Sequence, residues 1–215
     1  MIDDYLYNEY LKLSEDEKYA LMVYKSKLGY LINDLDNNPD FESYYEGVKE
    51  VLNNPANIFV KMTVYKNIDM TSIETFKSSI EKIKDTVESI LTMITLNEDL
   101  TVYRLVSADE EINDLAKGNI ISTSLSFAET ISFLGDKENI AIFQINLHKG
   151  DPVMYVPYSL LTHSKDNRMT LSNRQNQDEI ILDKRAYDFE KVGSSLIENK
   201  YQFIEYDAKV KTKQR

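Results

Sequence analysis

The sequence contains no cysteine and no tryptophan, and its 215 residues include only two histidines. Without cysteine there is no disulfide framework, no thiol nucleophile, no zinc ribbon and no iron–sulfur cluster. His148 and His163 leave little material for a histidine-based metal cage or a Ser–His relay. Any enzymatic chemistry must therefore rest on carboxylates, arginine, hydroxyl groups or a bound cofactor, and we expect no metal site.

Glycine is scarce and positive charge is in deficit. The six glycines are scattered singly, so no Gly-rich phosphate-binding loop is present. The net charge of −11 is unfavourable for a partner that is a polyanion. Residues 1–99 hold 19 acidic and 10 basic side chains, whereas residues 100–215 hold 17 and 15. The acidity thus belongs mainly to the first half, and nucleic acid is the less favoured macromolecular partner.

Targeting signals are missing as well. No apolar run approaches the roughly 20 residues of a membrane-spanning helix, so we expect no membrane partner. The first residues have neither the basic nor the apolar region of a secretory signal peptide. We therefore expect a cytosolic protein where it is synthesised, and action in a host cytosol would need a route that uses no signal peptide.

The first part of the chain has the pattern of amphipathic helices. Ser14 and Glu17 fit a capping box, and the apolar residues that follow continue one helical stripe as far as Leu35. A shorter helix is expected over 41–52, and a second capping box, Thr71 with Glu74, precedes a long stripe that ends near Ile94. We expect these stripes to be packing faces.

From about residue 98 the pattern changes to short runs rich in Val, Ile, Tyr and Thr, which are typical of strands. The expected fold class is α+β, with a helical lead-in over 1–97, a β core over 98–208 and a basic tail over 209–215. Short helices are expected over 110–117 and 128–134, and 157–177 is a long polar stretch of the kind that is usually functional or disordered. The expected strands are 101–107, 119–124, 140–147, 152–156, 179–183 and 201–207.

Three signals in the β-rich part carry chemistry. Arg104 lies inside an otherwise apolar strand, and a half-buried guanidinium needs a partner, either a carboxylate of the protein or a bound phosphate. Ser122 and Ser124 share one face of their strand, with Thr123 on the other. Gln177 and Glu179 share one face at the start of an apolar strand. Each signal is weak when it is taken alone.

In this order, Tyr103-Arg104, Ser122-Thr123-Ser124 and Gln177-x-Glu179 resemble the mono-ADP-ribosyltransferase superfamily of bacterial toxins and phage enzymes. The resemblance covers about residues 98–207. It implies a core of two packed antiparallel β-sheets with NAD+ in the cleft between them. The helical lead-in is similar to the helices that precede the catalytic core in the exoenzyme toxins.

The resemblance also implies roles for individual residues. Glu179 would be the catalytic carboxylate, Ser122 would position it, and Gln177 would recognise the acceptor. Arg104 would grip the phosphate and nicotinamide ribose of NAD+, and Phe127 would place its ring against the nicotinamide. The other cofactor-binding residues that it implies are Tyr103, Thr123 and Ser124. None of these roles requires cysteine, histidine or a metal ion, which agrees with the composition.

The amide of Gln177 gives information about the acceptor. In the superfamily a glutamate at this place accompanies arginine as acceptor, whereas glutamine resembles the asparagine-modifying exoenzymes and the enzymes that modify guanine. We therefore expect a protein side chain other than arginine. The alternatives are an NAD+ glycohydrolase, a guanine- or nucleotide-directed transferase, and a catalytically silent binding module. The helices of 1–97 would be a structural support for the core or a surface that docks a partner.

Overall fold

The computed structural model describes residues 2–26, 28–37, 40–57, 63–107, 115, 118–132, 140–157, 178–197 and 201–211. Within these ranges the chain forms two compact units. The helices between Leu13 and Ile90 make up one unit, and residues 1–12 together with the strands after Leu91 make up the other. The α+β class, with helices that precede a β core, is confirmed.

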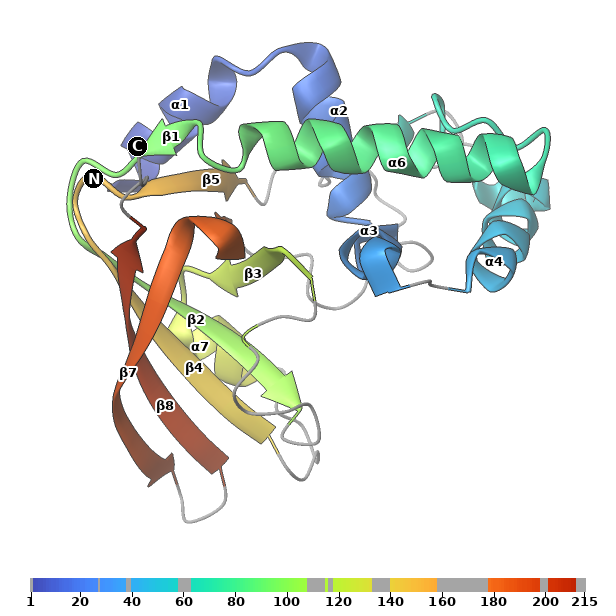
Figure 1. Cartoon of the computed structure of the whole chain (residues 1–215). Helices are drawn as coiled ribbons and strands as arrows, with labels where there is room; N and C mark the ends of the chain where they lie inside the picture. The colour runs from blue at the N-terminus through green and yellow to red at the C-terminus, as the bar shows by residue number, and fades with distance from the viewer. Residues whose placement is uncertain are drawn as a thin grey trace. The chain divides into compact units, whose positions relative to one another are not determined.

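The helical unit is built around its longest helix, α6 (Ile73–Ile90), which packs against α2, α3 and α4 (Figure 1). The apolar stripe predicted for α6 is its buried face, since Phe76, Ile80 and Val87 have no exposed surface. The predicted end is wrong, because α6 ends at Ile90 and Ile94 lies in β1 (Ile94–Thr95). The other elements of this unit are α2 (Glu15–Tyr24), α3 (Leu28–Asp34), α4 (Phe41–Asn53) and the short 3-10 helices η1 (Leu35–Asn37) and η2 (Pro55–Asn57).

The beginning of α2 confirms the first capping box. The Ser14 side chain accepts a hydrogen bond from the backbone N–H of Glu17, and the Glu17 side chain accepts one from the backbone N–H of Ser14. Both groups would otherwise lack a partner at the helix N-terminus. The second capping box is wrong by one residue, because Ser72 and Thr75 exchange this pair of bonds and α6 begins at Ile73.

The single stripe from Leu21 to Leu35 is divided between two helices, α2 and α3. The break has a local cause: Ser26 Oγ donates to the carbonyl of Val23 and accepts from the N–H of Leu28, which begins the new helix. A Cβ atom on Gly29 would lie 2.1 Å from the carbonyl oxygen of Tyr24, so only glycine permits this close approach of the two helices. Periodicity alone did not reveal the break because both helices bury the same stripe.

The β-rich unit contains, within the described residues, an eight-stranded sheet in the order β1-β5-β6-β3-β2-β4-β8-β7 (Figure 1). Among the described strands, β4 and β8 form the only parallel pair. The strands are β1 (Ile94–Thr95), β2 (Leu100–Ser107), β3 (Ile120–Ser124), β4 (Ile140–Leu147), β5 (Pro152–Val156), β6 (Glu179–Asp183), β7 (Tyr187–Ile197) and β8 (Tyr201–Val210).

The resemblance implied two packed sheets. In the structure the strands form one sheet, which consists of two halves. β2 pairs with β4 through eight residues, but with β3 only at Tyr103 opposite Ser124. One half, β1-β5-β6-β3, is antiparallel throughout, and the other, β2-β4-β8-β7, contains the parallel pair. The single rung between β2 and β3 is where the halves meet, and every described candidate residue lies near it.

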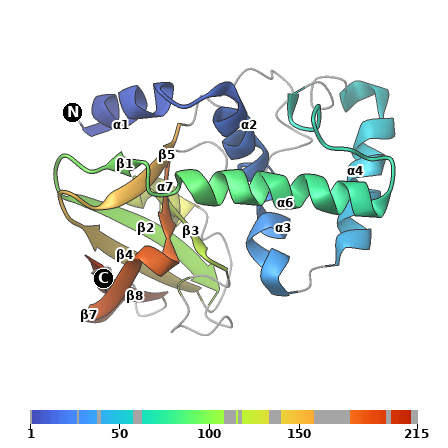
Figure 2. The same cartoon turned by 45° about the horizontal axis from the view of Figure 1, so that its top comes forward.

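Two elements of this unit flank the strands. Helix α1 (Ile2–Leu11) lies beside β1 (Figure 2). The hydroxyl of Tyr5 donates to the carbonyl of Thr95 at 2.7 Å. The short helix α7 (Phe127–Ser132) directly follows β3 and accounts for the described part of the helix expected over 128–134.

The strands β1 and β7 were not predicted, although β7 is the longest of the sheet. β7 forms an edge of the sheet and exposes most of its side chains, so it lacks an apolar alternation. A register shift between Lys191 and Gly193 interrupts its period of two. The helix expected over 110–117 and the polar stretch over 157–177 lie almost entirely outside the described residues. No helix in the described ranges is long and apolar enough to cross a bilayer.

Candidate active site

A serine and a glutamate from neighbouring strands meet at the centre of the sheet. Ser122 in β3 donates its hydroxyl hydrogen to Glu179 Oε2 in β6, with an Oγ–Oε2 distance of 2.8 Å. Glu179 is 8% exposed, so most of its surface is shielded from water. A buried carboxylate needs such a donor, because the desolvation of an ionised group without a hydrogen bond is costly. The sequence predicted this association, and the structure brings the two residues together.

Arg104 in β2 lies next to this pair. Its neighbours on the same face, Val102 and Val106, are buried, and Arg104 itself is half-buried. Its Nη1 donates to the backbone carbonyl of Ser122 at 2.7 Å. The guanidinium is therefore anchored to the residue whose side chain holds Glu179, and three strands contribute one connected group.

The hydroxyls of Thr123 and Ser124 make bonds within the protein. Thr123 is buried, and its Oγ1 donates to the carbonyl of Ile180 in β6 at 2.7 Å. Ser124 accepts from the N–H of Ser126, which turns the chain from β3 into α7. Thr123 thus joins β3 to the strand that begins with Glu179, and Ser124 shapes the turn that follows it.

Tyr103 and Phe127 contribute to an aromatic cluster. Their ring centroids are 5.3 Å apart, and Phe203 in β8 packs edge-on against Phe127 at 6.1 Å. Because Tyr103 and Arg104 are successive strand residues, their side chains point to opposite faces. Phe203 was missed by the sequence analysis, since an aromatic residue in a strand carries no signal beyond packing. Gln177 lies outside the described residues.

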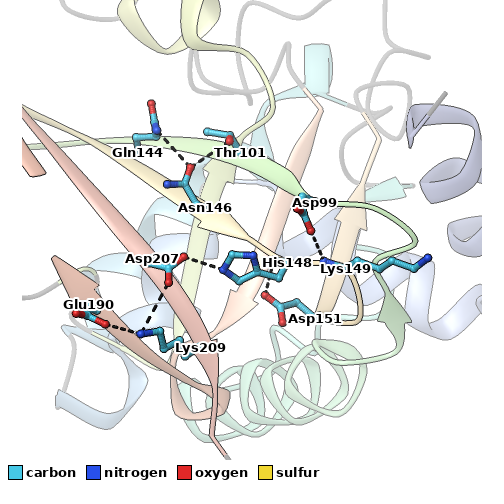
Figure 3. Close-up of polar contacts among 10 residues, drawn as sticks. All are labelled: Asp99, Thr101, Gln144, Asn146, His148, Lys149, Asp151, Glu190, Asp207 and Lys209. Carbon is cyan, nitrogen blue, oxygen red and sulfur yellow. Dashed lines mark hydrogen bonds and ion pairs between the residues drawn. The ribbon is translucent and has the colours of Figure 1, made fainter. Parts of the chain in front are cut away.

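A second polar group connects the turn between β4 and β5 to β8 (Figure 3). His148 Nε2 and Asp207 Oδ1 are 2.7 Å apart, and the backbone N–H of His148 donates to Asp151. Burial raises the pKa of the Asp151 carboxyl, and the bond from His148 opposes that rise. Nothing in the sequence singled out this group, because His148 and Asp151 lie in one turn and Asp207 lies in a strand far along the chain. Among the described residues no group of three acidic or histidine side chains is arranged to hold a metal ion.

No protein-family model matches the chain, and no curated protein matches its sequence. Solved structures do match its fold. The chain is similar to Plx2a, an ADP-ribosyltransferase toxin from Paenibacillus larvae, with 15% identity over 97% of this chain and 92% of that one, at a TM-score of 0.55. It is also similar to C3stau2 from S. aureus, solved with NAD, with 16% identity over 97% and 92% of the two chains, at a TM-score of 0.55.

A third similar structure is an ADP-ribosyltransferase from Clostridium botulinum, with 14% identity over 96% of this chain and 94% of that one, at a TM-score of 0.53. In each case the match extends over the helices as well as the strands. At these levels of identity the likeness establishes architecture. The chain has the fold of the mono-ADP-ribosyltransferase toxins, as the resemblance in its sequence implied.

Proposed function

We propose that this protein is a mono-ADP-ribosyltransferase, which transfers ADP-ribose from NAD+ to a protein side chain other than arginine. The observation that carries the proposal is the 2.8 Å hydrogen bond between Ser122 Oγ and Glu179 Oε2. It supports the motif assignment because two residues far apart in the sequence meet in the relation that the family resemblance requires.

The chemistry requires a negative charge beside the ribose. The bond between the nicotinamide nitrogen and ribose C1′ breaks, and nicotinamide leaves as a neutral molecule with the electron pair of that bond. C1′ becomes positively charged in the transition state, and a fixed carboxylate stabilises that charge. The acceptor nucleophile then bonds to C1′ and loses its proton. We assign the stabilising carboxylate to Glu179.

Arg104 is assigned to the phosphates of NAD+. Its planar guanidinium can bind a phosphate through two hydrogen bonds. The bond from Nη1 to the carbonyl of Ser122 fixes the position of the guanidinium relative to Glu179. Holding the phosphate part of the substrate fixes the position of the ribose, so binding energy is used for orientation. Thr123 supports this arrangement through its bond to Ile180, and Ser124 through the turn into α7.

The acceptor class follows from Gln177, which precedes the catalytic carboxylate by two residues. An amide pairs with another amide or with the edge of a base, and it lacks the charge that orients a guanidinium. The net charge of −11 makes a protein acceptor more favourable than nucleic acid. We propose that the reaction takes place in a cytosol.

The test is incubation of the purified protein with labelled NAD+, with and without cell lysate. We expect the label on lysate protein, and we expect Glu179→Gln to lower the rate by about 10²–10³-fold, as loss of an electrostatic stabiliser does. Glu190→Gln, a change at an exposed carboxylate on β7, is the matched control.

Each alternative has its own outcome in this assay. Nicotinamide release without labelled product would replace the transferase by a glycohydrolase, and label on nucleic acid would replace the protein acceptor. If nicotinamide is not released and no product is labelled, the protein is a binding module without this activity. A rate for Glu179→Gln within twofold of wild type would overturn the assignment of the catalytic carboxylate.

A further inference from the structure

A row of directly paired residues crosses most of the sheet. Glu205 in β8 pairs with Gln144 in β4, Gln144 with Tyr103 in β2, and Tyr103 with Ser124, which pairs with Glu179. Within β2, β4 and β8, residues that are directly opposite each other point to the same face of the sheet. At about 4.8 Å between strands, Glu205 lies about 19 Å along the sheet from Glu179, too far for both to touch one side chain.

Glu205 differs from the neighbouring carboxylates in having no bonded partner among the described residues. Asp207, the next residue on the same face of β8, is engaged by His148 and lies 4.0 Å from Lys209 (Figure 3). Glu190 on β7 pairs with Lys209. Glu205 is half-buried, yet it makes no hydrogen bond or ion pair with any described residue. A partly desolvated carboxylate is stabilised by a hydrogen-bond donor.

The neighbouring strand leaves room for this carboxylate. Gly193 in β7 is paired with Glu205, and a Cβ atom on Gly193 would lie 2.8 Å from Glu205 Oε2. A Cβ atom at 193 would make the carboxylate shift, at little cost because Oε2 is the far end of a flexible side chain. The glycine therefore permits the Glu205 side chain to lie over β7.

A second acceptor lies on β4, which flanks β8 on the side away from β7. Gln144 Nε2 donates to Asn146 Oδ1 at 3.2 Å, and Thr101 Oγ1 donates to the same oxygen at 3.1 Å (Figure 3). These bonds direct the amide nitrogen of Gln144 toward Asn146 and its carbonyl oxygen away from it. Gln144 and Glu205 are paired across adjacent strands and share one face of the sheet, and the Glu205 carboxylate leans toward β7.

Aromatic rings adjoin the two acceptors. Phe203 precedes Glu205 by two residues and shares its face of β8, and it packs against Phe127, which packs against Tyr103. All three side chains are half-buried, so each keeps part of its surface exposed. A carboxylate, an amide carbonyl and an aromatic ring together provide charge, hydrogen-bond acceptors and a stacking surface.

We propose that Glu205, Gln144 and Phe203 bind an arginine side chain of a protein partner. A guanidinium carries several donors in one plane and stacks on aromatic rings, whereas an ammonium satisfies only the charge. A phosphate would be repelled by Glu205. The assignment of this partner as the acceptor rests on the proposed function. Because of its distance from Glu179, the arginine is a docking contact and differs from the modified side chain.

The test measures peptide binding to the full chain in the absence of NAD+, so it does not depend on catalysis. The probe is a fluorescein-labelled nine-residue peptide with three arginines spaced by glycine and serine, followed by anisotropy. Matched peptides carry lysine or citrulline, the neutral isostere of arginine. We expect the arginine peptide to bind most tightly, the lysine peptide at least threefold more weakly and the citrulline peptide not measurably.

Two variants and one control locate the site. Glu205→Gln removes the charge with little change of shape, and Gly193→Ala displaces the carboxylate without changing the charge. Each should raise the Kd for the arginine peptide at least threefold, whereas Glu190→Gln, with the same change in net charge as Glu205→Gln, should raise it less than 1.5-fold. Equal effects of Glu205→Gln and Glu190→Gln, or binding of citrulline as tight as that of arginine, would overturn the proposal.

A failure here is separable from a failure of the proposed function. If the wild-type protein modifies lysate protein but binds all three peptides equally, the arginine contact is wrong and the transferase stands. If the arginine peptide binds as expected but no NAD+ is consumed, the proposed arginine-binding site is supported and the proposed reaction is wrong.

Discussion

Ser122 and Glu179 are joined by a hydrogen bond although they lie 57 residues apart in the chain. The register places Ser124, not Ser122, directly opposite Glu179, so the bond runs diagonally from β3 to β6. Diagonal neighbours on one face are within reach of a long side chain. The position of the carboxylate therefore depends on the register of two strands and on the Ser122 hydroxyl.

Replacing Ser122 by alanine should slow the reaction without loss of the fold. A hydrogen bond to a charged group is worth about 1.5–3 kcal/mol, which corresponds to roughly a 10- to 150-fold loss in kcat/KM. Nicotinamide release at several NAD+ concentrations measures the loss. Ser195→Ala on the edge strand β7 removes a serine hydroxyl far from Glu179 and serves as the control. A rate for Ser122→Ala within twofold of wild type would show that the bond has no part in catalysis.

Arg104→Lys should weaken the binding of NAD+. Lysine keeps the positive charge, but it has no planar fork with which to hold both a phosphate and the carbonyl of Ser122. We expect an increase in KM for NAD+ of about tenfold, equivalent to about 1.4 kcal/mol. Arg185→Lys is the matched variant, because Arg185 is exposed and pairs with Asp183 at the far end of β6. Equal KM values for the two variants would contradict the role assigned to Arg104.

Thr123→Val should reduce stability, because the Thr123 hydroxyl is buried and bonded to Ile180. Valine has nearly the same shape but leaves the bond unmade, which costs about 1–2 kcal/mol. The free energy of unfolding in urea measures this cost, and Thr123→Ser, which keeps the hydroxyl, should recover part of it. Equal free energies of unfolding for the valine and serine variants would mean that the hydroxyl does not stabilise the pairing of β3 with β6.

The sequence predicted the described strands of the site because these strands are short, apolar and bounded by turn residues. β4, β5 and β6 have the predicted bounds, and β2 and β3 differ by one residue. The meeting of Ser122 with Glu179 was accessible only through the family resemblance. Spacing along the chain contains no information on which strands become neighbours.

Other features depend on tertiary contacts that no local pattern encodes. β7 has polar side chains on both faces and a register shift, so its alternation is lost. The break between α2 and α3 depends on the approach of Gly29 to the carbonyl of Tyr24, which a continuous apolar stripe conceals. Glu205 and Gln144 become neighbours through the parallel pairing of β4 with β8, whose partners lie about 60 residues apart.

Asp151→Asn should change how stability depends on pH. Burial raises the pKa of the Asp151 carboxyl above its ordinary value, so the folded state keeps the proton at a pH where the unfolded state has lost it. Stability from this group is therefore greatest at low pH and decreases as the pH rises through the interval from the ordinary value to the folded one. Asparagine has no charge to desolvate, and its carbonyl oxygen still accepts the bond from the N–H of His148.

The asparagine variant should thus be at least as stable as wild type at pH 7, and its advantage should shrink as the pH is lowered toward 4. Urea unfolding at pH 4, 5.5 and 7 measures this difference. Asp188→Asn is the control, because Asp188 is exposed and lies 3.7 Å from Lys211 in an ion pair at the surface. An advantage of Asp151→Asn that grew toward low pH would contradict the raised pKa. It would mean that the bond from His148 outweighs burial in setting the charge of this carboxyl.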